Sequence, residues 1–283
     1  MGYNNFMAIS VTKASGVSEP FSEAKVRSSL KRAGAKPEII DKVLVSLTGK
    51  LYDGITTRAI YRQVFDSLAQ FQEGIHHRYS LKDAIMKLGP SGYPFEKFVA
   101  RLLDHLGFTT QTQVTVQGQC IEHEIDVSAL KDDQHFLIEC KYHNRPGTKS
   151  RSRDALYTQA RFEDVVAGYK SNSNHVNKFH QAWLVTNTKL TSNAVKYGRC
   201  KGMKLLAWRY PEKGSLEQLI EANNLHPLTC FTFLDLRDRQ SLLQNDLVLC
   251  RDITTATDQR LSDLGLSSDK VKRLKAAAAS LHG

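Results

Sequence analysis

The chain has 283 residues, and its lysines and arginines exceed its aspartates and glutamates by 39 to 29. The formal charge of +10 and a pI of about 9.3 favour a polyanionic partner such as nucleic acid. Charge alone does not separate DNA, RNA and a membrane surface. No apolar run approaches the roughly 20 residues of a membrane span, and no basic segment with a hydrophobic signal core opens the chain. We therefore expect a cytoplasmic protein that does not enter the membrane.

The first 90 residues predict a hairpin followed by helices. Residues 7–21 alternate weakly around a turn-forming Ala14-Ser15-Gly16. Four helices are expected at Ser22 to Gly34, Pro37 to Leu47, Thr56 to Leu68, and 79–88. The adjacent His76 and His77 lack the spacing of a metal pair on one helical face, so they are expected on a helix surface. The five cysteines are widely scattered, which predicts reduced thiols.

A breaker cluster at 88–92 separates this first domain, residues 1–90, from a different pattern. Apolar spacing and flanking turns predict, in order, a helix at 93–106, strands at 112–117, 122–130 and 135–142, a helix at 154–168, a strand at 182–187, a helix at 191–200 and a strand at 203–210. This order describes a mixed-sheet α/β domain at 91–212, and residues 213–283 form a small helical domain. The fold class is multidomain α/β.

Two neighbouring strands carry the residues with chemical potential. Glu139 and Lys141 project to one side of their strand because successive side chains alternate. If the preceding strand pairs antiparallel, Asp126 approaches Glu139 across the sheet. Close carboxylates repel unless a cation intervenes, and hard oxygen ligands suit Mg²⁺ or Mn²⁺. A nearby lysine can orient a water molecule, which completes the requirements of phosphodiester hydrolysis.

Asp126 followed by Glu139-Cys140-Lys141 resembles the core of the PD-(D/E)xK nucleases. The upstream GYPFEKFVARLLDHLGF resembles the first helix of the Mrr-like type IV restriction endonuclease branch, although Ile125 replaces the proline of the superfamily name. The resemblance covers about 91–211. It implies catalysis by Asp126, Glu139, Lys141 and Glu96, with metal ligands from Asp126, Glu139, Glu96 and the Cys140 carbonyl. A solvated strand face is the simpler alternative for Glu139 and Lys141 alone.

A basic loop leaves the last of these strands. Between 141 and 161, lysines and arginines outnumber acids, and phosphate contacts dominate nucleic-acid affinity. The candidate DNA-binding residues are Arg145, Lys149, Arg151, Arg153, Tyr157 and Arg161. Tyr157 and Arg161 share one helical face, and ordinary surface packing is the alternative for them.

The first domain resembles the ATP-cone of ribonucleotide reductases through Val11-Thr12-Lys13, Gly16, Glu19, Phe21, Lys25 and the run 52–57. The resemblance implies binding of ATP or dATP by Val11, Lys13, Glu19, Lys25 and Thr57. Ala14 and Ser15 stand where an arginine and an aspartate are usual, which removes a bidentate phosphate contact. A purely structural helical domain is the alternative.

The last residues resemble half of a helix-hairpin-helix, with a plain amphipathic hairpin as the alternative. Together these features predict a Mg²⁺-dependent restriction-type endonuclease of double-stranded DNA, including modified DNA, that is regulated by an adenine nucleotide and forms a homodimer. A Holliday-junction or repair nuclease would share the chemistry. A nucleotide-sensing DNA-binding module without catalysis is the alternative of another class.

Overall fold

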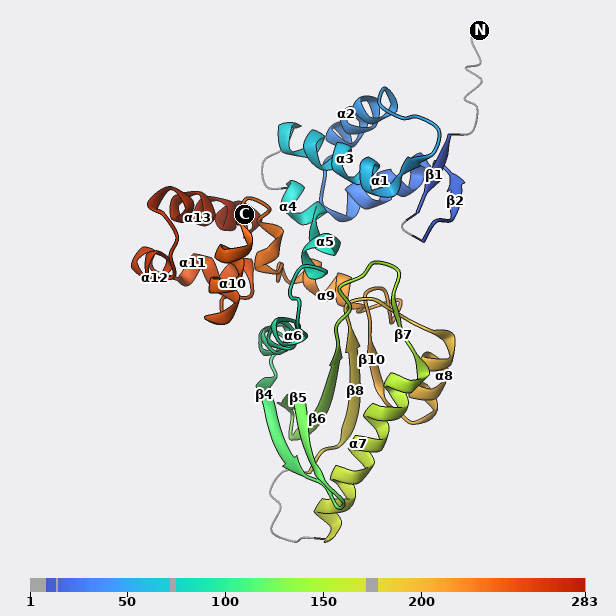
Figure 1. Ribbon diagram of the computed structural model, residues 1–283, viewed down its shortest axis with the longest axis vertical. Coiled ribbons are helices and arrows are strands. Elements are labelled where there is room, and N and C mark those ends of the chain that lie inside the picture. The colour runs from blue at the N-terminus through green and yellow to red at the C-terminus, as the bar shows by residue number, and fades with distance from the viewer. Residues whose placement is uncertain (1–8, 14, 72–74, 172–177, 283) are drawn as a thin grey trace.

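A computed structural model describes residues 9–13, 15–71, 75–171 and 178–282. Its N-terminal module combines a small sheet with helices (Figure 1). The elements are β1 (Ser10–Thr12), β2 (Ser18–Pro20), α1 (Glu23–Arg32), α2 (Pro37–Thr48), β3 (Ile55–Thr56) and α3 (Thr57–Phe71). β1 pairs antiparallel with β2, as the predicted hairpin requires, and parallel with β3. Ala14, in the predicted turn, lies outside the described residues.

The predicted helix ends agree with the structure, with one exception. The Ser22 side chain caps α1, and Pro37 occupies the first turn of α2. The helix predicted at 79–88 is the shorter α5 (Leu81–Ile85), and a further short helix, α4 (Ile75–Tyr79), precedes it. Ser80 separates them, and its hydroxyl donates to the carbonyl of His77. This local bond competes with continued helical pairing.

The central module is built on a five-stranded mixed sheet. Its elements are α6 (Tyr93–His105), β4 (Thr109–Gln117), β5 (Glu122–Lys131), β6 (Gln134–Lys141), β7 (Lys149–Ser150), α7 (Ser152–Ser171), β8 (Gln181–Thr186), β9 (Lys189–Leu190), α8 (Ser192–Cys200) and β10 (Lys204–Leu206). The strand order is β10-β8-β6-β5-β4. β4, β5 and β6 are antiparallel neighbours, whereas β6, β8 and β10 run parallel. The two-residue strands β7 and β9 pair separately and were not predicted.

The two faces of this sheet are covered by different helices (Figure 1). Ile138 and Cys140 belong to the core that contains the α6 residues Phe98 and Leu102. On the opposite face, Leu137 packs with Val165 of α7. The apolar stripe predicted for the first helix of this module is therefore buried against the sheet.

The C-terminal helices extend the same core. They are α9 (Leu216–Ala222), η1 (Leu228–Cys230), α10 (Leu236–Gln244), α11 (Cys250–Thr255), α12 (Asp258–Asp263) and α13 (Ser268–His282). Val248 and Leu274 lie in one apolar cluster with Phe98, and helices α10 to α13 gather beside α6 in Figure 1. The N-terminal module has a separate core, which runs in sequence from Val11 to Ile75.

One surface prediction is wrong. His77 is 5% exposed, and its Nδ1 lies 3.2 Å from the carbonyl oxygen of Cys230 in η1. Its ring makes an edge contact with Phe231. Helical periodicity cannot show that a distant segment covers this face of α4.

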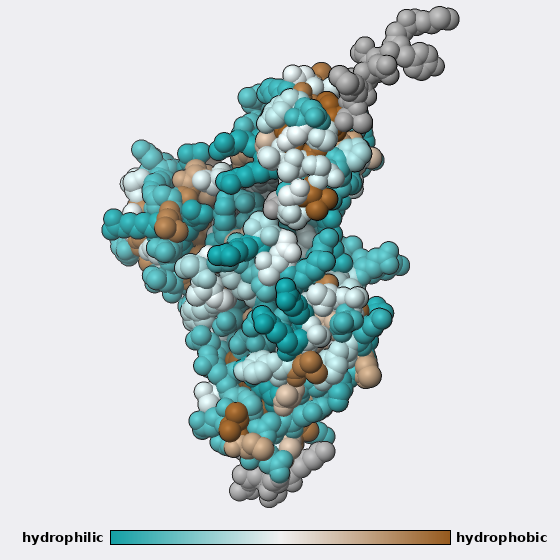
Figure 2. All heavy atoms as spheres, turned by 45° about the vertical axis from the view of Figure 1, so that its right-hand side comes forward, coloured by the Kyte–Doolittle hydropathy of each residue, from teal (hydrophilic) through white to brown (hydrophobic). Residues whose placement is uncertain are grey.

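The exposed surface is mainly polar on the face seen in Figure 2, with apolar side chains scattered singly. None of the described helices is long and apolar enough to cross a membrane.

Candidate active site

Acidic side chains from three elements meet near the carboxyl end of β6. Glu139 is on β6, Asp126 is on β5, and Glu96 is in the first turn of α6. Glu96 experiences the negative charge of both other carboxylates, and Glu139 experiences that of Asp126. The structure therefore brings these three residues together. Glu124 is exposed at the edge of this group and adds to its charge.

The regular alternation of β5 breaks at Asp126. Ile125 packs on the α7 side of the sheet, whereas Val127 packs on the α6 side. Opposite Asp126, Gln113 of β4 has a φ of 53°, an uncommon backbone conformation for this residue type. The Asp126 carboxylate turns toward β6, and its Oδ2 accepts a 2.7 Å hydrogen bond from the Cys140 amide. The side chain thus occupies a position where a regular ladder bond would otherwise form.

Arg161 of α7 neutralises part of this charge. Its Nη1 donates to Glu139 Oε2 at 2.8 Å and to the Glu124 carbonyl at 2.7 Å. Its Nη2 donates to the Tyr157 hydroxyl at 2.6 Å. Arg161 and Glu139 side chains are only 12% and 9% exposed, so water screens their attraction weakly. The sequence placed Arg161 among DNA-binding residues and did not predict its bond to Glu139.

Burial and mutual repulsion shift the acidity of these carboxyl groups. Burial, followed by the charges of Asp126, Glu124 and Glu139, raises the pKa of Glu96 to about 7. Burial also raises the pKa of Glu139, and Asp126 adds to this, while Arg161 and Lys141 oppose it. Burial raises the pKa of Asp126, and the hydrogen bond from the Cys140 amide opposes this shift. A bound cation would favour the charged form of all three.

The donor set suits a hard divalent cation, because it consists of carboxylate oxygens beside main-chain carbonyls. Asp126 and Glu139 each use one oxygen, Oδ2 and Oε2, in a bond to the protein. Within the described part of the chain, no three His, Cys, Asp or Glu side chains converge closely enough to hold a metal ion together. The Cys140 thiol is buried on the opposite face of the sheet, so only its carbonyl would be available as a ligand.

A hollow of about 530 Å³ is lined by Glu139 and Lys141. Four residues around α7 complete its lining: Arg153, Asp154, Tyr157 and Arg161. Of the remaining basic residues predicted to bind DNA, Arg145, Lys149 and Arg151 are exposed on the segment that leads into α7. Of the predicted residues, the hollow therefore brings together Glu139, Lys141, Arg153, Tyr157 and Arg161, while Asp126 and Glu96 are not among its lining residues.

Asp154 is a lining residue that sequence reasoning missed. It is 9% exposed in the first turn of α7, where its Oδ2 accepts a 2.8 Å bond from the Arg151 amide. Its charge also acts on Glu139. An acidic residue is typical of the first turn of a helix, so the sequence could have indicated that Asp154 lies in the first turn of α7. Its proximity to β6, however, depends on how α7 packs on the sheet.

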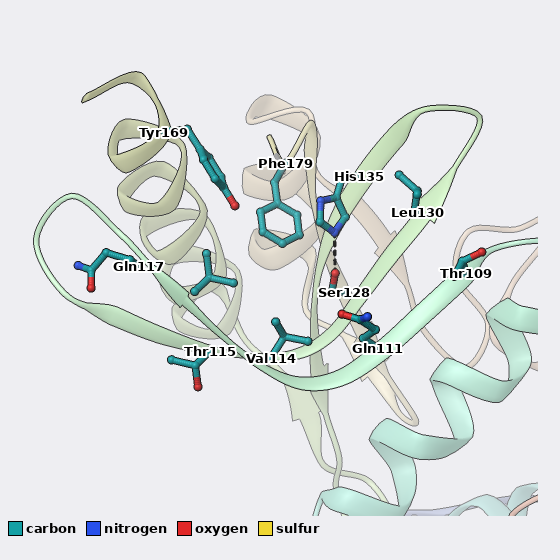
Figure 3. Close-up of a pocket in the computed structure, with 11 residues that line it drawn as sticks. Thr109, Gln111, Val114, Thr115, Gln117, Ser128, Leu130, His135, Tyr169 and Phe179 are labelled. Carbon is teal, nitrogen blue, oxygen red and sulfur yellow. Dashed lines mark hydrogen bonds between the residues drawn. The ribbon is translucent and has the colours of Figure 1, made fainter. Parts of the chain in front are cut away.

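A second hollow, of about 400 Å³, lies toward the opposite end of the strands (Figure 3). The described residues that line it include no carboxylate, lysine or arginine. His135 stacks on Phe179 with ring centres 3.9 Å apart, and its Nε2 lies 2.6 Å from the Ser128 hydroxyl. These lining residues therefore carry no fixed charge that could bind a phosphodiester.

The residues predicted to bind nucleotide lie around β1 of the N-terminal module. Val11 pairs with Glu19 across the hairpin, and Thr57 begins α3 directly after β3. Glu19 forms ion pairs with both Lys13 and Lys25, the latter at 2.8 Å. These two ammonium groups, which come from separate elements, therefore converge on one point.

Family models assign both modules to known classes. A restriction endonuclease model, the Mrr catalytic domain, matches residues 89–209, and an ATP cone domain model matches 9–85. The fold and the comparisons thus define a protein with an ATP-cone N-terminal region, a restriction-endonuclease-like α/β domain and a helical C-terminal region.

Residues 226–282 match the model named AF1548-like, C-terminal. An uncharacterised protein of Archaeoglobus fulgidus is 41% identical over 185 residues, which cover 65% of this chain and all of that protein. A crystal structure described as a protein of unknown function, AF1548, has 41% identity and a TM-score of 0.58, covering 68% of this chain and 98% of the other. The chain belongs to this AF1548-like family, with an Mrr-like restriction endonuclease domain.

Proposed function

We propose that the chain is a divalent-metal-dependent endonuclease that hydrolyses phosphodiester bonds of double-stranded DNA. The observation that carries this proposal is that Asp126, Glu139, Glu96 and Lys141 lie near enough for their charges to act on one another, in a restriction-endonuclease-like domain. Such chemistry requires negative ligands for a cation and a positive group beside them.

Each residue has a distinct role in this proposal. Asp126, Glu139 and Glu96, with the Cys140 carbonyl, would hold Mg²⁺ or Mn²⁺. The ion would polarise the phosphate and lower the pKa of a bound water. Lys141 would orient the attacking water and offset negative charge that develops on the phosphate. Arg161 would remain paired with Glu139 and keep its carboxylate ionised.

The test is cleavage of plasmid DNA by the full chain in the presence of Mg²⁺ or Mn²⁺. We expect Asp126→Asn and Lys141→Met to lower the cleavage rate by about 100-fold or more, because each removes a charge next to the reacting phosphate. Glu122→Gln is a matched control, since Glu122 is an exposed carboxylate at the start of the same strand as Asp126. DNA binding without metal-dependent cleavage by the unaltered chain would reject the nuclease and favour a binding module.

Substrate type requires a separate comparison. Methylated, unmethylated, nicked and four-way-branched DNA presented at equal concentration distinguish a restriction enzyme from a junction or repair nuclease. We expect preference for linear duplex over branched DNA, because Arg145, Lys149, Arg151 and Arg153 follow one another along an exposed segment whose Arg153 lines the hollow. Strong preference for four-way branches would favour the repair function.

We also propose that the N-terminal module binds ATP or dATP through Lys13 and Lys25, whose ammonium groups converge on Glu19. At a nucleotide concentration of about 100 times the Kd, the free energy of unfolding should rise by about 2.7 kcal/mol. Thermal unfolding with and without ATP measures this gain. Lys25→Met should abolish most of it, whereas Lys50→Met, at an exposed position in the same module, should retain it. Equal gains in both variants would contradict the assignment.

A further inference from the structure

The segment that links the N-terminal module to the sheet contacts the residue after Lys141. The Tyr142 hydroxyl donates to the Met86 carbonyl at 2.6 Å and accepts from the Gly89 amide at 3.2 Å. Its ring centre lies 5.8 Å from that of Phe95 in α6. Tyr142 lies just past β6 and packs against the apolar core that contains Phe95, whereas Lys141 lines the hollow on the other side of the sheet. The link therefore attaches to the side of β6 that faces away from the hollow.

Asn187 fixes the backbone of His143, two residues past the end of β6. It is fully buried, its Oδ1 accepts from the His143 amide at 2.9 Å, and its Nδ2 donates to the His143 carbonyl at 2.8 Å. The regular pairing of β6 with β8 ends at Lys141 and Thr186. The Asn187 side chain thus adds one more pair of bonds just beyond Lys141, where ladder pairing has stopped.

The link also holds Asn187. The Lys82 ammonium donates to the Asn187 carbonyl at 2.6 Å and lies 4.3 Å from the centre of the Trp208 ring. The Asn187 Nδ2 is 3.3 Å from the sulfur of Met86. Lys82 and Met86 of the link therefore both contact Asn187, which fixes His143. Met86 also accepts the hydrogen bond from Tyr142.

We propose that Tyr142 and Asn187 are positioning residues for Lys141, and that the link from Lys82 to Gly89 determines through them where the Lys141 ammonium lies. This inference rests on the proposed nuclease function. The neighbouring carboxylates have other supports, since Asp126 is held by the Cys140 amide and Glu139 by Arg161. A displacement of the link would therefore move the lysine relative to the acidic ligands and change turnover more than DNA affinity.

The test uses the full-length variants Tyr142→Phe and Lys82→Met, each of which removes one polar group and keeps an apolar side chain. Loss of one such hydrogen bond should lower kcat for Mg²⁺-dependent plasmid cleavage by about fivefold, with KM for DNA unchanged. Amide hydrogen exchange of the segment 141–143 should accelerate by a similar factor. Tyr210→Phe is the matched control, because its hydroxyl accepts a 2.8 Å bond from Arg199 in the same module. It should change neither quantity.

Each outcome decides between positioning and simple destabilisation. A merely structural effect would lower the unfolding temperature and would raise KM while lowering kcat, so the unfolding temperature and both kinetic constants are measured in every variant. Exchange rates and kcat values equal to those of Tyr210→Phe would overturn the inference. If the unaltered chain does not cut DNA, the nuclease function fails, and the exchange measurement still decides whether the link holds residues 141–143. Unchanged exchange in both variants would then reject that contact as well.

Discussion

The Glu139 carboxylate lies between a group that neutralises it and a group that repels it. Arg161 bonds to one of its oxygens, while Asp126 and the low-dielectric surroundings disfavour its charge. Glu96 has no arginine among the groups that shift its pKa, and three acidic neighbours raise it. Burial is the largest cause of the raised pKa of Glu96, and of the three carboxyl groups only Glu96 has no arginine opposing the shift.

This difference predicts how Glu96 affects stability with pH. Its pKa of about 7 in the folded chain exceeds the ordinary value of 4.5, so the folded state retains a proton that the unfolded state has released. Its contribution to stability therefore falls as pH rises from about 4.5 to about 7. The side chain is half-buried, and solvent screening reduces the full effect. We expect Glu96→Gln to raise the free energy of unfolding by about 1 kcal/mol at pH 8 and not at pH 4.5.

Urea unfolding at the two pH values measures this gain. Glu122→Gln, which alters an exposed carboxylate of β5, should show no such dependence on pH. Adding Mg²⁺ at pH 8 should stabilise the unaltered chain more than Glu96→Gln, because the cation relieves the same repulsion. A gain that is equal at both pH values would show that the folded chain does not raise the pKa of Glu96.

At the level of elements, the turn between β4 and β5 is tied closely to α7. Asp164 of α7 accepts from the Cys120 amide at 2.9 Å, and its other oxygen lies 2.8 Å from Nε2 of His123. A Cβ at Gly168 would lie 2.8 Å from the Gly118 carbonyl carbon and 2.9 Å from the Gln119 amide. The helix can approach the turn this closely only without a side chain at Gly168.

Gly168→Ala should therefore destabilise the protein by about 1 to 3 kcal/mol, because the contacting atoms are backbone and cannot rotate away. Gly49→Ala is the control, since a Cβ there meets no atom within 4 Å and the φ of −67° suits any residue. It should be neutral or slightly stabilising. Denaturant unfolding compares the two, and equal stability would mean that the turn can shift without strain.

The local sequence pattern was sufficient to predict the strands that carry Asp126 and Glu139. It was insufficient to predict which side chains of other elements contact these strands. Alternating apolar positions placed Asp126 and Glu139 on neighbouring strands, and helical spacing located α6. The bond from Arg161 to Glu139 spans 22 positions and depends on how α7 packs. Asn187 replaces a missing ladder bond only because two strand ends meet. Such contacts depend on tertiary packing, which cannot be predicted from the periodicity of a single segment.

At the scale of the whole molecule, the excess of lysine and arginine over acidic residues includes exposed arginines next to the acidic site. Arg151 and Arg153 are exposed, and Arg153 lines the hollow with Lys141. If both contact phosphates, Arg151→Gln with Arg153→Gln should reduce the slope of log affinity against log salt by about 1.8, since each contact contributes about 0.9. Fluorescence anisotropy with duplex DNA over a salt series measures the slope. Lys42→Gln with Lys50→Gln removes equal charge from the N-terminal module, and the same reduction there would indicate only a net-charge effect.

The apolar cluster shared by α6 and the C-terminal helices limits whether the nuclease domain can be separated from those helices by gene recombination. A gene fragment encoding only residues 89–209 would leave Phe98 and Leu102 without the Val248 and Leu274 part of their cluster. The protein encoded by this fragment would expose a hydrophobic patch and would tend to aggregate. Recombination that moves the nuclease domain into a new gene must therefore carry the last segment with it or supply another cover of similar shape.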